Sequence, residues 1–288
     1  MKKILVLGSR GMLGHVVYHY IKSLNRFNII DSSFNNKLNP NSHLLDVRNN
    51  KDLELFISQN KPDIIINCIG VLLEASSMDP SNAIYLNSYL PHMLSKLISS
   101  YNCKLIHIST DCVFSGNKGS YIETDYKDAR DIYGLSKALG EINNNRDLTI
   151  RTSIIGPEIK VEGKGLFHWF MLQKNKISGY TNVFWSGVTT IELAKAIVWA
   201  IDNNTTGLYH ITNGKKITKN DLLQHINKHT GKDLIIEPVE VVFSDKSILD
   251  TREELNYIIP SYEIMVKEMI QMIKQNKKLY TQYNLGPK

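Results

Sequence analysis

The amino-acid sequence predicts a doubly wound α/β fold, in which helices cover both faces of a parallel sheet, followed by a smaller C-terminal region. Two observations predict it. Short, continuously apolar runs alternate with helical patterns through the first half of the chain, and the first run leads into a glycine-rich turn. Continuous apolar runs are typical of strands that are buried on both faces, as strands are in parallel sheets.

Five strands are expected in the first half, each of them a short apolar run: residues 4–7, 28–30, 63–69, 104–108 and 148–151. Between the third and fourth runs lies a long helical pattern that opens at Asp79-Pro80, where Asp is a good N-cap and Pro suits the first helical position. Pro91 lies inside this pattern. We expect it to kink the helix, because proline has no backbone N–H to donate.

Beyond residue 151 strands become sparser, and glycines and aromatic residues cluster. Thr189 with Glu192, and Thr218 with Asp221, have the spacing of capping boxes, which start helices. The elements expected here are a helix near 190–202, a strand at 207–212, a helix near 219–229, and a last helix from Ser261 to about Gln275. This change in pattern indicates a second, substrate-facing region.

Composition and charge exclude several classes of protein. With 288 residues, 42% hydrophobic and 22% charged, the chain is neither disordered nor a minimal disulfide scaffold. Its 34 Lys and Arg exceed its 28 Asp and Glu, but much of the surplus lies beyond Glu268 and forms no long basic block, so no nucleic-acid partner is expected. No apolar run approaches the ~20 residues that span a bilayer, so no membrane partner is expected either.

The three cysteines, Cys68, Cys103 and Cys112, form no CxxC pair and lie in or beside apolar runs. We expect buried thiols in a reducing cytoplasm. His225 and His229 are spaced like a metal-binding pair on a helix, but no third ligand lies nearby in the sequence. No metal site is therefore predicted.

A glycine-rich turn, Gly8-Ser-Arg-Gly11-Met-Leu-Gly14, follows the first strand and opens a helix. In this context backbone N–H groups and the helix N-terminus can face a pyrophosphate, as in a Rossmann fold. We therefore predict a dinucleotide-binding Rossmann domain at residues 1–152. Residues 153–288 are predicted to bind mainly substrate, with 186–202 returning to the first domain.

The choice of cofactor depends on two conflicting residues. Asp31, near the end of the second strand, is able to accept a hydrogen bond from a ribose hydroxyl, which favours NAD(H). Arg10, inside the glycine turn, is able to pair with a 2′-phosphate, which favours NADP(H). We favour NADP(H) and keep NAD(H) as the alternative.

Tyr133 and Lys137 are four residues apart and so share one face of a predicted helix. There the ammonium is able to lower the pKa of the phenol from about 10 and let it exchange a proton near neutral pH. They follow the run Ser109-Thr-Asp-Cys-Val-Phe-Ser-Gly116, which begins at the carboxyl end of a strand, where open parallel sheets bind ligands. The cofactor turn, the acid–base pair and the hydroxyls are thus expected to converge.

These motifs resemble a known family. Gly8xxGly11xxGly14, Asn67-Cys-Ile-Gly70, the 109–116 run, Tyr133-Gly-Leu-Ser-Lys-Ala-Leu-Gly-Glu141 and Arg151-Thr-Ser-Ile-Ile-Gly156 occur in the order of extended short-chain dehydrogenases/reductases. The pattern is most similar to the dTDP-4-dehydrorhamnose reductase branch. The resemblance covers residues 1 to about 156 and is loose beyond them.

The resemblance implies an NAD(P)H-dependent reductase of the 4-keto group of a nucleotide-linked 6-deoxyhexulose, in the synthesis of a surface polysaccharide precursor. Tyr133 would donate the proton, Lys137 would bind the nicotinamide ribose, and Thr110 would hydrogen-bond the substrate carbonyl. The expected substrate contacts are Ser109, Thr110, Cys112, Val113, Phe114, Tyr133, Arg151 and Trp185. The expected cofactor contacts are Gly8, Ser9, Arg10, Gly11, Met12, Leu13, Gly14, Asp31, Asp46, Val47, Asn67, Cys68, Ile69, Gly70, Ser109, Tyr133 and Lys137.

Cys112 departs from the related patterns. Sugar-nucleotide dehydratases of the superfamily typically have Glu at this position as a second acid, so dehydration is disfavoured. The rhamnose reductases usually have an aromatic residue there, which leaves the hexose and the product configuration open. A nucleotide-sugar epimerase and a non-catalytic NADP-binding regulatory subunit remain as alternative functions, and a homodimer is left open.

Overall fold

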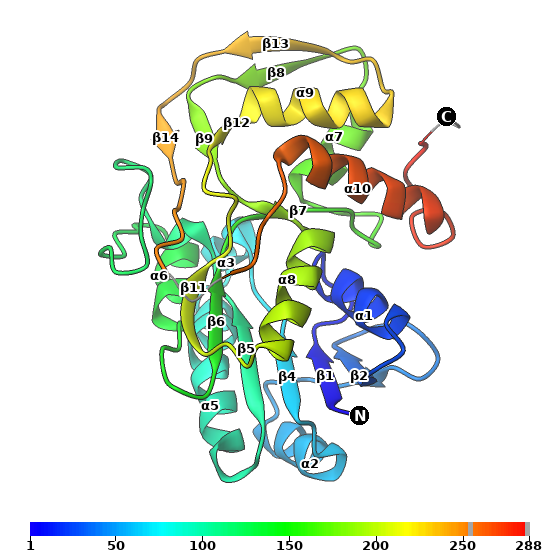
Figure 1. Ribbon diagram of the computed structural model, residues 1–288, viewed down its shortest axis with the longest axis vertical. Coiled ribbons are helices and arrows are strands. Elements are labelled where there is room, and N and C mark those ends of the chain that lie inside the picture. Colours follow the sequence, from blue (N-terminus) through cyan, green and yellow to red (C-terminus); the bar gives the residue numbers. More distant parts are fainter. Residues whose placement is uncertain (253–255, 286–288) are drawn as a thin grey trace.

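A seven-stranded parallel sheet forms the largest part of the structure, a computed structural model that describes residues 1–252 and 256–285 (Figure 1). Its strand order is β11-β6-β5-β4-β1-β2-β3, and every neighbouring pair is parallel. The strands are β1 (Lys3–Leu7), β2 (Asn28–Ser33), β3 (His43–Leu44), β4 (Ile64–Asn67), β5 (Lys104–Ile108), β6 (Leu148–Arg151) and β11 (Gly207–His210). The order reverses between β1 and β4, which is where folds of this kind form a ligand crevice.

Apolar side chains of the strands enter two separate cores, one on each face of the sheet. Along β1, Ile4 and Val6 join the core that includes α1 (Gly14–Ser23) and α8 (Thr190–Asp202). Leu5 and Leu7 join the core of α2 (Asn50–Asn60) and α5 (Leu90–Leu97). Successive strand residues point to opposite faces, so a strand between two helical layers is apolar throughout. The predicted doubly wound α/β fold is confirmed.

The helical segment between β4 and β5 is broken close to where Pro91 predicted a kink. It consists of α3 (Leu73–Met78), α4 (Pro80–Ala83), the π-helical turn η1 (Ile84–Tyr89), α5 and the 3-10 turn η2 (Ile98–Ser100). The π turn ends two residues before Pro91, which is consistent with a missing N–H and a ring that crowds the preceding turn. Asp79 caps α4 as expected, because its carboxylate accepts the backbone N–H of Asn82 at 3.0 Å.

Past β6 the chain builds a second layer of short strands and helices above the sheet (Figure 1). These elements are β7 (Ile154–Ile155), α7 (Leu166–Leu172), β8 (Lys176–Tyr180), β9 (Val183–Trp185), β10 (Val188–Thr189), β12 (Ile217–Thr218), α9 (Lys219–Thr230), β13 (Ile235–Val239), β14 (Ser244–Asp245) and α10 (Tyr262–Gln275). Thr189 and Thr218 cap α8 and α9 through their side chains, as predicted. Ser261 occupies the N-cap position of α10 but makes no side-chain capping bond.

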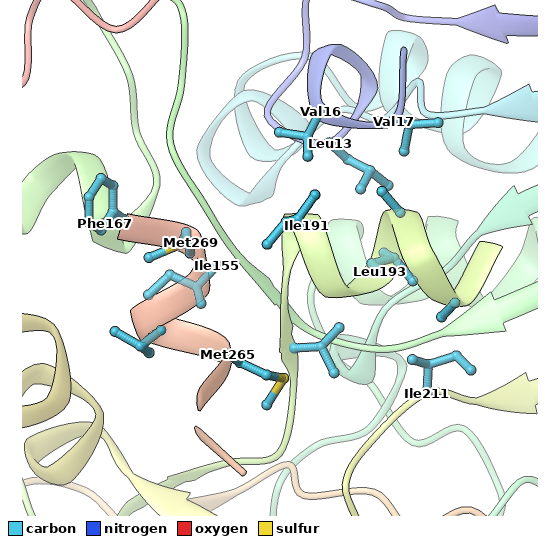
Figure 2. Close-up of a cluster of buried hydrophobic side chains, with 14 of the residues drawn as sticks. Leu13, Val16, Val17, Ile155, Phe167, Ile191, Leu193, Ile211, Met265 and Met269 are labelled. Carbon is cyan, nitrogen blue, oxygen red and sulfur yellow. The ribbon is translucent and has the colours of Figure 1, made fainter. Parts of the chain in front are cut away.

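One apolar cluster extends from the large sheet into the second layer. Figure 2 shows Leu13 and Val17 near α1 facing α8, which carries Ile191 and Leu193. The same cluster continues through α7 and α10 (Figure 2). The segment after residue 152 supplies both α8 and the edge strand β11 to the first part, whereas the sequence had suggested only 186–202; the division at residue 152 remains a prediction.

Candidate active site

The glycine turn brings the backbone close to the ends of two strands. Gly8 has a φ of +80°, which is open to glycine and strained for other residues. A Cβ on Gly14 would lie 2.2 Å from the carbonyl oxygen of Gly8, so helix α1 can start this near to β1 only with glycine there. Leu13 at the N-cap of α1 makes no side-chain capping bond. The turn and the start of the helix therefore suit an anion such as a pyrophosphate.

A pocket of about 310 Å³ opens over this turn. Eight of the predicted cofactor residues line it: Gly8, Arg10, Gly11, Asp46, Val47, Cys68, Ile69 and Gly70. Sequence reasoning missed eight others: Ser32, Ser33, Phe34, Leu45, Arg48, Asn82, Leu86 and Lys160. The two serines and Phe34 lie at or just past the carboxyl end of β2. Because parallel sheets bind ligands at the carboxyl ends of their strands, this position could have indicated them. Lys160 lies in a loop that carries no motif.

Asp31 does not line this pocket. It is 2% exposed, and its carboxylate accepts hydrogen bonds from Ser9 Oγ at 2.5 Å, Ser42 Oγ at 3.0 Å and Asn39 Nδ2 at 3.3 Å. The contact of Asp31 with a ribose stays a prediction; in this structure the carboxylate holds the glycine turn against β2 through Ser9. Arg10 does reach the pocket, and its Nη1 donates to the carbonyl of Lys37 at 3.0 Å.

Eight further residues expected at the cofactor do not line this pocket. They are Ser9, Met12, Leu13, Gly14, Asn67, Ser109, Tyr133 and Lys137. Asn67 is fully buried, with its Nδ2 3.3 Å from Nδ1 of His107 and its Oδ1 accepting the N–H of Ile69 at 3.1 Å. Ser109 donates its hydroxyl to Oε1 of Glu141 at 2.7 Å.

The predicted acid–base residues Thr110 and Tyr133 lie where two short helices touch. Thr110 caps the 3-10 turn η3 (Asp111–Val113), accepting the N–H of Cys112 at 3.1 Å, and Tyr133 lies on α6 (Ile132–Leu139). Gly134 permits the contact, since a Cβ there would be 2.3 Å from the carbonyl oxygen of Cys112. Glycine is therefore required after Tyr133 in the motif, because a larger residue would prevent α6 from packing against η3.

Burial sets the protonation of both predicted acid–base residues. It raises the pKa of the Tyr133 phenol above its ordinary value, with the Cys112 side chain adding to the rise and the Thr110 hydroxyl opposing it. It lowers the pKa of Lys137 to about 8, against the opposing effect of Glu141. Lys137 donates to the carbonyl of Ile108 at 2.6 Å. The predicted lowering of the phenol's pKa is not observed: the phenol stays protonated at neutral pH and suits a proton donor.

Four of the predicted substrate contacts are buried in the interior: Val113, Phe114, Arg151 and Trp185. Phe114 stacks on Tyr121 with ring centres 4.1 Å apart. The Arg151 guanidinium, 2% exposed, donates to both carboxylate oxygens of Glu141 at 2.8 and 2.7 Å. The contact of these four side chains with the sugar stays a prediction.

A second pocket, of about 840 Å³, lies in the upper layer. Its lining comprises Leu166, Trp169, Gln173, Lys176, Ile177, Ser178, Tyr180, Val183, Lys219 and Leu223. Lys219, on the wall of this pocket, has its ammonium 5.3 Å from the centre of the Trp185 ring. The charge of Asp111 opposes the lowering of the Lys219 pKa by burial. Sequence reasoning missed Lys219, which follows a capping residue and carries no motif.

The chain belongs to the family described as RmlD substrate binding domain, which matches residues 1–248. It is 29% identical over 143 residues to a dTDP-4-dehydrorhamnose reductase of Aggregatibacter actinomycetemcomitans, covering 49% of this chain and 46% of that protein. It is 26% identical over 153 residues to methionine adenosyltransferase 2 subunit beta of Xenopus laevis, covering 52% of this chain and 45% of that protein. These matches span less than half the length of either relative.

Among solved structures, the fold is similar to that of a dTDP-4-dehydrorhamnose reductase from Bacillus anthracis in complex with NADP. The TM-score is 0.80 at 21% identity, over 94% of this chain and all of that one (100%). At this identity the likeness establishes the fold. Within residues 1–252 and 256–285, no helix is long and apolar enough to cross a membrane, and no three His, Cys, Asp or Glu side chains gather as metal ligands would.

Proposed function

We propose that the protein reduces the 4-keto group of a nucleotide-linked 6-deoxyhexulose with NADPH, in the cytoplasm, for a surface polysaccharide precursor. One observation carries the proposal: Thr110, which follows β5, and Tyr133, near the start of α6, are held together where η3 packs against α6, at the same carboxyl edge of the sheet as the glycine turn. Lys137 donates to the carbonyl of Ile108 at the end of β5, and the neighbouring strand β4 leads into Cys68, which lines the pocket at the glycine turn. On the other side, the charge of Lys219, which lines the upper pocket, opposes the rise that burial gives the pKa of Asp111.

The residues at this site suit carbonyl reduction. A bound nicotinamide supplies a hydride to the ketone carbon. Negative charge then builds on the ketone oxygen, where the Thr110 hydroxyl donates a hydrogen bond and the Tyr133 phenol gives up its proton. Because its pKa is raised, the Tyr133 phenol is protonated at neutral pH before the transfer. Lys137, which is charged below its pKa of about 8, would bind the nicotinamide ribose.

The pocket at the glycine turn fits a dinucleotide. Glycines leave the backbone of the turn accessible, Phe34 offers a ring to the adenine, and Arg10 and Ser33 offer donors to a 2′-phosphate. Asp31, the carboxylate that would repel this phosphate, is buried away from the pocket. These features support NADP(H) over NAD(H).

The upper pocket fits the nucleotide part of the substrate. Trp169 and Tyr180 line it and are 40% and 43% exposed, so each offers a ring face to a base. Lys176 and Lys219 give it positive charge, although Lys176 also pairs with Glu237. A dTDP- or UDP-linked sugar bound here would direct its hexose toward Lys219 and Asp111.

The test is NADPH oxidation by the purified protein with dTDP-4-keto-6-deoxyglucose and its UDP counterpart. We expect one NADPH consumed for each keto sugar reduced. An epimerase would interconvert sugars without net consumption. A regulatory subunit, the alternative suggested by the methionine adenosyltransferase relative, would bind NADPH without turnover. Either result would overturn the proposal. Size-exclusion chromatography would decide whether the protein is a homodimer.

A further inference from the structure

The loop between β7 and α7, residues 156–165, passes from the second layer to the pocket at the glycine turn. Lys160 of this loop lines the pocket together with Gly8, Gly11 and Arg10. Lys160 belongs to no motif and was not among the predicted site residues. The loop belongs to the part of the chain expected to bind substrate, yet it places a cation over the expected cofactor.

The far end of the loop is packed on the glycine turn itself. A Cβ on Gly165 would lie 2.7 Å from Cε of Met12, the residue between Gly11 and Leu13. Glu158 folds the loop back, since its Oε1 accepts the N–H of Gly165 at 2.6 Å and that of Lys164 at 2.9 Å. The loop is thus fixed near the turn at its end and by its own carboxylate.

The C-terminal segment after α10, red in Figure 1, secures the start of the loop. The Tyr283 hydroxyl accepts the N–H of Glu158 at 3.0 Å and lies 2.9 Å from Nδ1 of His168. Gln282 donates its side-chain amide to the carbonyl of Glu158. These contacts join residues more than a hundred positions apart, so they give the loop one preferred placement.

The same segment also reaches the glycine turn from behind. His15 lies with Nδ1 2.7 Å from the carbonyl oxygen of Gly11 and Nε2 2.9 Å from the Tyr280 hydroxyl. Burial lowers the pKa of His15 to about 4, so the ring is neutral, donates from Nδ1 to Gly11 and accepts from Tyr280. The C-terminal segment therefore contacts both the turn and the loop that faces it.

The charges of the pocket favour an anion beneath Lys160. Four charged side chains line it, and Asp46 is paired with Arg48 at 2.8 Å. Arg10 and Lys160 thus leave the pocket positive. In the described parts of the chain no carboxylate lies within salt-bridge distance of Lys160, while Lys164 on the same loop pairs with Glu74 at 2.5 Å.

We propose that Lys160 binds the pyrophosphate of the dinucleotide and that Tyr283 and Gln282 position it by holding its loop. This inference rests on the proposed cofactor site. The pyrophosphate is the group that fits, because Lys160 shares the pocket with Gly8 and Gly11 and its loop ends on the glycine turn. Arg10, bonded to the loop after β2, faces the adenosine end.

The test compares Lys160→Ala with the matched control Lys164→Ala, which removes the same charge from the same loop. Dissociation constants for NADPH and NADH are measured by titration calorimetry. We expect Lys160→Ala to weaken both cofactors by about tenfold, the scale of one charge-assisted hydrogen bond, and Lys164→Ala to change neither by more than about twofold.

Three outcomes would overturn the inference alone: unchanged binding in Lys160→Ala, equal losses in the two variants, or a loss for NADPH only, which would assign Lys160 to the 2′-phosphate. A parent protein that binds neither cofactor would instead overturn the proposed function, and the inference with it. The four dissociation constants and the parent values distinguish these cases.

The positioning role is tested by Tyr283→Phe, which removes the acceptor for the Glu158 N–H. In the otherwise unchanged protein, we expect Tyr283→Phe to weaken the binding of both cofactors three- to fivefold. In a protein that already carries Lys160→Ala, we expect Tyr283→Phe to have no further effect, because the Tyr283 hydroxyl acts on the cofactor only through the loop that carries Lys160. The control is Tyr280→Phe, because Tyr280 lies on the same segment but bonds His15 and not the loop. Any effect of Tyr280→Phe on cofactor binding is expected to be the same with and without Lys160→Ala. Additive effects of Tyr283→Phe and Lys160→Ala would contradict the positioning role.

Discussion

Lys137 is a buried cation, and its burial limits the pH range in which its side chain stays charged. Burial lowers its pKa to about 8 from the usual 10.5. The ammonium is therefore charged at pH 7 and loses its proton as the pH rises through 8. The phenol of Tyr133 has a raised pKa and stays protonated over the same range.

We predict that kcat/KM for reduction falls above a pKa of about 8, because the neutral amine holds a ribose less well. In Lys137→Arg the guanidinium stays charged, so the alkaline fall moves to higher pH, even if the rate is lower throughout. The pH dependence of NADPH oxidation in both proteins checks this. An alkaline limb that is the same in parent and variant would assign the titration to another group.

Arg10 is the residue on which cofactor choice is expected to depend. It lines the pocket, whereas Asp31 does not. We predict that Arg10→Ala lowers kcat/KM for NADPH by about 1.5–3 kcal/mol of transition-state stabilisation and leaves NADH little changed. Steady-state kinetics with both cofactors measure it. A parent that strongly prefers NADH, or equal losses for both cofactors, would show that Arg10 does not select the phosphate.

Residue types alone predicted an acid–base site at Thr110, Tyr133 and Lys137, because their spacing places them at one strand end and on one helix face. The partners of Arg151 and Asp31 were not predicted. Arg151 pairs with Glu141, and Asp31 accepts hydrogen bonds from Ser9 and Ser42. No local pattern reveals such contacts.

At the scale of elements, the π turn η1 is fitted to the end of helix α6. Asn87 in this turn exchanges hydrogen bonds with the backbone of Val71, accepting its N–H at 2.9 Å and donating to its carbonyl at 3.0 Å. Its own carbonyl lies against Gly140, where a Cβ would be 1.8 Å from that oxygen. The helix that carries Tyr133 is therefore positioned by a backbone contact.

Gly140→Ala is predicted to destabilise the protein by about 2–3 kcal/mol, since the backbone of η1 must move to admit the methyl group. Gly70→Ala is the matched control, because its Cβ would meet Asn87 Oδ1 at an ordinary 3.6 Å. Urea unfolding of the two variants measures the difference. Equal free energies of unfolding for Gly140→Ala and Gly70→Ala would contradict this prediction, because they would mean that the contact between η1 and Gly140 does not stabilise the protein.

The sequence predicted most elements because strand runs and capping residues are local. Strands β5 and β6 and the helix starts at Thr189 and Thr218 match the prediction. The π turn was not foreseen as such, because helical periodicity does not distinguish it from a kink. The edge position of β11 also depends on pairing with β6, which no local pattern reveals.

At the scale of the whole molecule, the described residues form one pocket at the glycine turn and a second pocket in the upper layer. The lower pocket is lined by the glycine turn and by residues at the ends of the neighbouring strands, and the upper one by residues of α7, β8, β9 and α9. One continuous apolar cluster joins the two layers (Figure 2). In the proposed function, the cofactor binds at the lower pocket and the nucleotide sugar at the upper one.

The most direct test of the proposed reductase is the rate of NADPH oxidation with a dTDP-4-keto-6-deoxy sugar in Tyr133→Phe, measured beside its dissociation constant for NADPH. We predict a turnover at least 10²-fold below that of the parent, with NADPH binding within about twofold, because only the proton donor is lost. Turnover near that of the parent in a folded Tyr133→Phe protein would contradict the account.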